Sequence, residues 1–90
     1  MASEISRMSR ALHRAHDKRV QESNLMFTPR RWEDLNHELQ DEFNTLAIAI
    51  HHTRHLPMPV RIDRLCDYYD LDPNDEAARQ YFTNRINECQ

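Results

Sequence analysis

The histidines are the side chains whose spacing comes closest to that of a metal site. The chain holds six of them in 90 residues, with His51 and His55 four residues apart and His13 and His16 three apart. On a helix each pair would share one face, where two imidazoles can contact one ion. A zinc site needs three or four ligands, so it would have to recruit a cysteine or the other pair. We therefore expect no bound metal and interpret His51 and His55 as a solvated pair near a helix end.

Catalytic chemistry has few candidates in this sequence. Cys66 falls on an apolar helical stripe with Ile62 and Tyr69, where a buried and unreactive thiol is the ordinary outcome. Glu38 and Glu42 lie one helical turn apart, which is typical of a solvated helix face rather than of a general acid and base. We predict that the chain is not an enzyme and that it has no catalytic residue and no cofactor.

Glycine is absent from the sequence. Phosphate-binding loops and dinucleotide-binding motifs need glycine where the backbone turns tightly or approaches a ligand closely. The absence therefore excludes the nucleotide-binding enzyme classes that depend on those motifs.

A basic seam runs along the first predicted helix, at steps of three, four and four residues; it consists of Arg7, Arg10, Arg14 and Lys18. The net charge is +4 for residues 1–31, −4 for residues 32–60 and −3 for residues 61–90. Such a seam can follow a phosphate backbone, pack on the acidic remainder, or contact a protein. Acidic residues interrupt it, and it contains no aromatic side chain to stack on a base. We favour protein contact and keep nucleic-acid binding as the alternative.

DNA reading by the C-terminal helices is a weaker possibility. The two helices predicted on either side of Leu71 invite comparison with a helix-turn-helix. Asp75 and Glu76 would then face phosphates as the second helix entered the groove, which like charges oppose. Two packed helices with an acidic first turn explain the same residues.

The apolar spacing predicts an all-α fold, a small bundle of four helices with one long central helix and no sheet. The predicted helices are residues 3–22, 29–55, 59–70 and 73–88. Thr28 and Pro29 suit the N-cap and first position of the second helix, and Pro57 and Pro59 end it. The chain is predicted to be a single domain of residues 1–90, with residues 1–24 as a basic N-terminal helix or arm and residues 28–90 as the helical body.

The long second helix carries an apolar stripe with an average spacing of 3.6 residues; its members are Trp32, Leu35, Leu39, Phe43, Leu46 and Ile50. A helix over residues 29–55 would be about 40 Å long at 1.5 Å per residue, which exceeds what two short C-terminal helices can cover. We therefore predict that this stripe forms an interface with another copy or with a partner protein.

The lengths of the apolar segments indicate where in the cell the protein resides. The longest apolar run, from Leu46 to Ile50, is far shorter than the roughly 20 residues that cross a bilayer, so no membrane association is predicted. The first ten residues lack the apolar stretch of a secretory signal. We expect a cytoplasmic protein in which Cys66 and Cys89 are thiols.

Together these features predict a non-enzymatic regulatory or inhibitory protein. It would form a homo-oligomer and bind a protein target such as a transcription or nucleic-acid-processing factor. The alternative is a nucleic-acid-binding regulator that uses the basic N-terminal helix, and the salt dependence of binding would separate the two.

Overall fold

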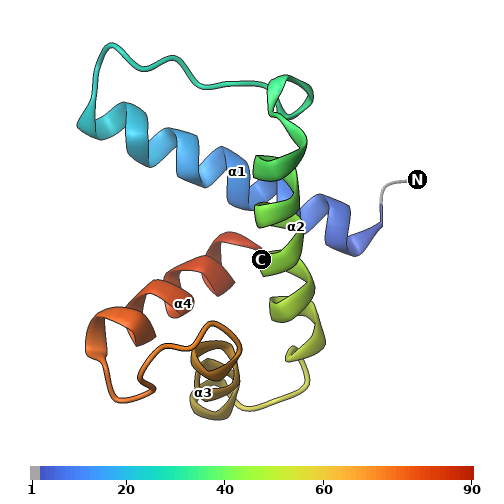
Figure 1. Cartoon of the computed structure of the whole chain (residues 1–90), viewed down its shortest axis with the longest axis vertical. Coiled ribbons are helices and arrows are strands. Elements are labelled where there is room, and N and C mark those ends of the chain that lie inside the picture. The colour runs from blue at the N-terminus through green and yellow to red at the C-terminus, as the bar shows by residue number, and fades with distance from the viewer. Residues whose placement is uncertain (1–2) are drawn as a thin grey trace.

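The computed structural model describes residues 3–90, which form four α-helices, a one-turn 3₁₀ helix and no strand (Figure 1). The elements in chain order are α1 (Glu4–Ser23), η1 (Trp32–Asp34), α2 (His37–His52), α3 (Met58–Tyr68) and α4 (Glu76–Glu88). The all-α bundle predicted from the sequence is confirmed.

Side-chain caps fix where three of these helices begin. Ser3, Asn36 and Asp75 cap α1, α2 and α4, and each accepts a hydrogen bond at 2.9–3.0 Å from a backbone N–H two or three residues further on. These bonds satisfy donors that have no partner inside the helix. In α3 the first turn contains Pro59, whose missing N–H costs nothing there.

The predicted helix over residues 29–55 is wrong in its first turns. Thr28 and Pro29 cap no helix, and the chain stays non-helical from Asn24 to Asn36 apart from η1. The physical reason is competition for the backbone: the Arg30 N–H donates to the carboxylate of Asp17 at 2.9 Å, which holds this segment away from a helical path. The start of α2 is set instead by the amide oxygen of Asn36.

A smaller correction concerns the last helix. The sequence predicted a start at Asp72 and Pro73, whereas the helix begins at Glu76 behind the Asp75 cap. Asp72 instead accepts the Asn74 N–H at 2.9 Å and closes a local turn.

Asp70 takes the position that glycine fills at many helix ends. Its φ is +57°, in the left-handed region, directly after α3. The N–H of Leu71 donates to the carbonyl of Cys66 at 2.8 Å and the N–H of Asp70 donates to that of Asp67 at 3.2 Å, the pattern of a Schellman cap. Aspartate tolerates this backbone better than most residues, which lets a chain without glycine end the helix sharply.

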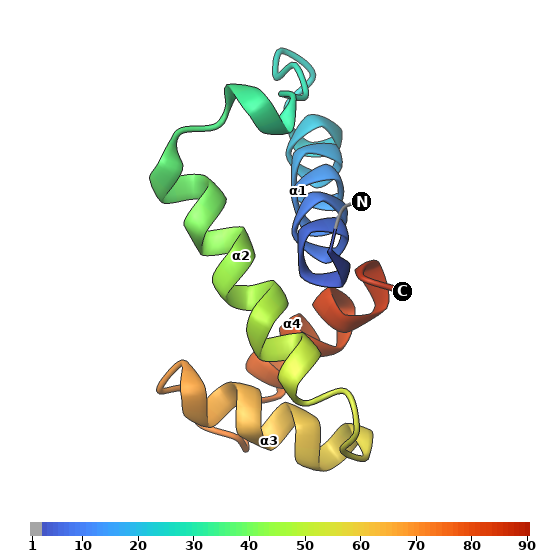
Figure 2. The same ribbon diagram turned by 90° about the vertical axis from the view of Figure 1, so that its right-hand side faces the viewer.

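The core lies where the four helices meet; its buried members are Met8, Leu12, Leu46, Ala47, Ile50, Ile62, Leu65, Cys66, Ala78, Phe82 and Ile86. α1 packs mainly on α2 and also touches α4, while α3 packs on α4 (Figures 1 and 2). Because Met8 and Leu12 are core residues, α1 is an integral part of the fold. Of the two forms expected for residues 1–24, a basic helix or an arm, the described residues form a helix that contributes to the core.

Candidate functional site

A buried carboxylate joins α1 to the loop that follows it. Asp17 accepts hydrogen bonds from the Arg30 guanidinium at 2.9 and 3.3 Å and from the Arg30 backbone N–H. The His13 Nε2 and His16 Nδ1 atoms each lie 3.0 Å from one of its oxygens. We call these four residues the Asp17 cluster. It fixes the base of the loop at residues 24–36.

The cluster is closed by aromatic side chains. The ring of His13 lies 5.9 Å from that of Trp32 and 5.5 Å from that of Phe43, both edge-on. The side chains of Asp17 and His13 are almost fully buried as a result. Buried polar groups with this many partners specify one arrangement of the chain, so the cluster positions the loop rather than exposing a reactive group.

Burial alone would raise the pKa of Asp17. The hydrogen bonds from the side chain and backbone of Arg30 and from His16, together with the charge of His13, outweigh burial and hold the pKa well below its ordinary value of 3.8. Asp17 is therefore ionised across the physiological pH range. The sequence reasoning missed this role, because Asp17 was read only as an acid interrupting the basic seam. Its spacing of four residues from His13 was the available signal.

The predicted basic seam is on the surface of α1 but is partly neutralised. Arg7 pairs with Glu4, and Arg10 pairs with Glu33 at 3.3 Å while its guanidinium lies 5.6 Å from the Trp32 ring centre. Arg14 and Lys18 are exposed and form no ion pair within residues 3–90. The basic surface continues onto the loop, where Arg10 and Arg14 border a hollow of about 290 Å³ with Arg30 and Arg31.

The predicted interface stripe is covered mainly from within the chain. Leu35, Leu46 and Ile50 are buried, Phe43 packs against the core, and Trp32 and Leu39 are half-buried. The argument that the stripe is too long to be covered is wrong, because α1 packs along α2. The stripe therefore gives no support for an interface with another chain, and the oligomeric state stays a prediction.

Two other apolar surfaces are exposed, and the sequence analysis assigned no role to either. The first is the tip of the loop, where the side chains of Leu25 and Met26 are 90% and 89% exposed. The N–H groups of Met26 and Phe27 donate to the side chain and backbone of Asn24 at 3.1 and 3.0 Å, which makes the tip a tight turn. The available signal was two adjacent apolar residues between the helices predicted at residues 3–22 and 29–55.

The second exposed surface is a groove of about 460 Å³ between α2 and α3. Its apolar lining is Ile48, Ala49, Leu65 and Tyr68, and its polar lining is His52, Thr53, Arg64 and Asp67. Ile48 is 39% exposed and Tyr68 is 63% exposed. The apolar run at residues 46–50 hinted at this groove, because a helix beside a core buries only one face and leaves the opposite side chain outside.

Carboxylates lie beyond the end of the groove, nearer the start of α2. A neighbouring hollow of about 240 Å³ is lined by Asp41, Glu42, Thr45 and Tyr69. The charged residues along both hollows are three carboxylates and one guanidinium, so the groove combines an apolar floor with an acidic border.

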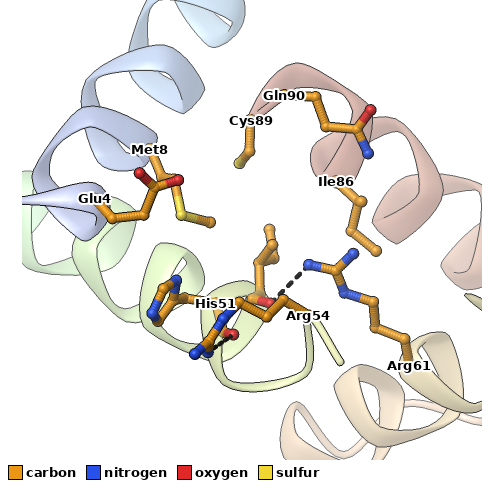
Figure 3. A pocket seen from close by; sticks show the side chains of 9 residues that line it. Glu4, Met8, His51, Arg54, Arg61, Ile86, Cys89 and Gln90 are labelled. Atoms are coloured by element: carbon orange, nitrogen blue, oxygen red, sulfur yellow. Dashed lines mark hydrogen bonds between the residues drawn. The ribbon is translucent and has the colours of Figure 1, made fainter. Parts of the chain in front are cut away.

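A further pocket of about 250 Å³ lies where all four helices converge (Figure 3). The Arg61 guanidinium reaches it from α3 and donates to the Ile50 carbonyl at 2.7 Å, while Arg54 donates to the His51 carbonyl at 2.8 Å. Both cations therefore serve carbonyls at the end of α2. Burial raises the pKa of the Cys89 thiol in this pocket to about 11, so it is protonated and not a nucleophile at neutral pH.

The structure brings the members of one predicted histidine pair together and separates those of the other. His13 and His16 come together on Asp17. His51 lies in the last turn of α2, which ends at His52, so His55 is beyond the helix and the two do not share a helical face. Across residues 3–90 no group of three or more histidine, cysteine or acidic side chains is arranged so that it could hold a metal ion.

Among residues 3–90, no helix combines the length and the apolar character that crossing a bilayer requires. Comparison with protein-family models, with curated proteins and with solved structures finds no match to this chain.

Proposed function

We propose that this chain is a non-enzymatic regulatory protein that acts by binding a partner protein in the groove between α2 and α3. The observation that carries the proposal is the apolar floor left open there, with Ile48 and Tyr68 exposed beside a cavity of about 460 Å³. Exposed apolar patches framed by polar residues are typical of interaction sites. The two thiols, Cys66 and Cys89, are unpaired, which supports a place in the reducing cytoplasm.

The border of the groove indicates the chemistry of the partner. Asp41, Glu42 and Asp67 outnumber the single guanidinium of Arg64. A helix that carries an apolar stripe between lysines or arginines would bury its stripe against Ile48 and pair its cations with these carboxylates. We infer that the partner presents such a basic amphipathic segment.

A model peptide tests this without knowledge of the natural partner. The probe is a fluorescently labelled helical peptide with a leucine stripe flanked by lysines, and its control has glutamate at every lysine position. Fluorescence anisotropy should show binding of the lysine peptide about tenfold tighter or more than that of the glutamate peptide.

Two matched variants locate the binding. Ile48→Ser removes an apolar contact from the groove without changing charge, and it should weaken binding about tenfold. Val60→Ser is the control, since Val60 has a similar exposure of 40% and does not line the groove. Equal binding by the two variants would show that the peptide sits elsewhere. A protein captured from native cells supports the proposal only if Ile48→Ser no longer retains it.

Nucleic-acid binding by α1 is the second candidate. The observation in its favour is the hollow bordered by Arg10, Arg14 and Trp32, since guanidinium and indole groups contact phosphates and bases. Arg14 and Lys18 are the cations of the seam without an acidic partner. Two phosphate contacts would give a shallow salt slope of about −1.8 in log K against log salt on duplex DNA. Binding of duplex DNA with a slope of about −1.8 or steeper, abolished by Arg14→Glu, would promote this candidate above protein binding.

A further inference from the structure

The tip of the loop at residues 24–36 displays two apolar side chains that no other residue of the described part of the chain covers. Among the large apolar residues at positions 3–90, Leu25 and Met26 have the highest exposures, and the turn built on Asn24 holds them side by side. Full exposure of two neighbouring apolar side chains is unfavourable in water. Their arrangement suits insertion into an apolar recess.

The loop that carries the tip is fixed at its base. Arg30, in the part of the loop that leads back to the helices, is hydrogen-bonded to Asp17 on α1. Its guanidinium also lies 5.5 Å from the Phe27 ring centre. A loop fixed at its base loses less conformational entropy when it binds. The Asp17 cluster therefore prepares the tip to act as a plug.

The chain itself provides a recess of suitable size. The Leu25 and Met26 side chains together have about eight non-hydrogen atoms, comparable to eight water molecules at roughly 30 Å³ each, or about 240 Å³. The groove between α2 and α3 offers about 460 Å³ and has an apolar floor. In Figure 2 the loop that follows α1 lies at the top of the molecule and α3 lies at the bottom, so the tip cannot enter the groove of its own chain.

The charges of the two regions are complementary. Residues 3–36, which form α1 and the loop with the tip, carry a net charge of +2, and residues 37–90, which form α2 to α4 and the groove, carry −5. Around the groove Asp41, Glu42 and Asp67 face solvent, whereas the exposed Lys18 lies on the helix that leads into the loop. A head-to-tail approach of two copies brings opposite charges together, and a head-to-head approach does not.

We propose that Leu25 and Met26 of one copy insert into the groove between α2 and α3 of a second copy. This inference rests on the proposed function, because it names an occupant of the same groove. The plug and the groove are different surfaces, so the contact is heterologous and generates a ring or an open chain of copies. Self-assembly would then compete with the partner protein for the groove. Binding of the partner would therefore weaken as the concentration of this chain rises.

Two complementary variants test the contact. The tip variant, Leu25→Ser with Met26→Ser, retains the groove, and the groove variant, Ile48→Glu, retains the tip. Each alone should be monomeric by light scattering and sedimentation velocity at concentrations where the unaltered chain associates. Mixed in equal amounts they should form a 1:1 complex and stop there, because only one intact plug and one intact groove remain. Val60→Ser is the matched control and should associate as the unaltered chain does.

Several results would overturn the inference. These are a monomeric unaltered chain at hundreds of micromolar, undiminished association of either variant, or no complex in the mixture. Circular dichroism of each variant confirms that the fold is retained, since all three positions are exposed. Sedimentation with anionic phospholipid vesicles adds a separate outcome: binding by the monomeric chain that the tip variant loses would assign the tip to a membrane instead. If self-association fails while the lysine peptide still binds the groove, the proposed function stands and only this inference is wrong.

Discussion

Replacing Asp17 with asparagine should destabilise the fold and release the loop at residues 24–36. The change removes the charge that holds the guanidinium of Arg30 and the rings of His13 and His16. Breaking a buried ion pair by removing one partner typically costs about 3–5 kcal/mol. The Arg30 side chain is 36% exposed and can regain water, so we expect the lower end, about 3 kcal/mol.

Urea denaturation followed by circular dichroism measures this cost. A small domain has a slope of about 1 kcal/mol per molar urea or slightly more, so the midpoint should fall by roughly 2–3 M. Trp32 is the only tryptophan and lies against His13, and its fluorescence should report opening of the loop before global unfolding. Asp34→Asn is the control, because Asp34 pairs with Arg31 on the exposed surface and should change the midpoint little.

The dependence on pH provides a second signature. The folded pKa of Asp17 is depressed, so its contribution to stability is fully present above the unfolded value near 3.8 and is lost as the pH falls below it. The stability difference between the unaltered chain and Asp17→Asn should therefore shrink between about pH 5 and about pH 2. A variant within about 1 kcal/mol of the unaltered chain, or a difference that persists in acid, would refute this account of the cluster.

Three further outcomes follow from the fold. Deletion of residues 3–22 should abolish the cooperative melt seen by circular dichroism, because it removes the core residues Met8 and Leu12. Asp70→Gly should raise the free energy of unfolding by up to about 1 kcal/mol in urea titrations, since glycine adopts the left-handed backbone without strain. Burial raises the pKa of both Cys66 and Cys89, so Ellman's reagent at about pH 8 should label them slowly until urea unfolds the chain.

The bounds of a helix could be predicted from the sequence where only neighbouring residues determine them. The first predicted helix, residues 3–22, nearly coincides with α1, and the proline pair at Pro57 and Pro59 marked the start of α3. In both places the deciding features are apolar spacing and backbone restrictions within a few residues. Local chemistry was enough there because no distant group competes for the same backbone.

The loop after α1 was not predictable, because the group that decides it is 13 residues away. Thr28 and Pro29 form a valid helix start by local rules. The Asp17 carboxylate instead takes the N–H and guanidinium of Arg30, and Asn36 supplies a competing cap. Leu35 still reaches the core side of the molecule, which is why the apolar spacing continued unbroken across the turn.

The candidate site was missed for a related reason. Apolar spacing identified Leu46 and Ile50 as members of a buried or bound face but could not say which helix covers them. α1 does so, although its own stripe is narrow. With that face covered within the chain, the large apolar side chains that stay exposed include Ile48 on the opposite side of α2 and Leu25 at the tip of the loop.

The residues that hold the loop in place differ from the residues that we propose for binding. The loop is held by Asp17 and Arg30 at its base and ends at the Asn36 cap, and none of these contacts involves the side chains of Leu25 or Met26. A loop of this length in a small domain is uncommon unless it has a function. Substitutions at the tip should therefore leave the unfolding midpoint unchanged while altering association, whereas Asp17→Asn should weaken both. That pairing of effects would identify the Asp17 cluster as the support of the tip and the tip as the contact itself.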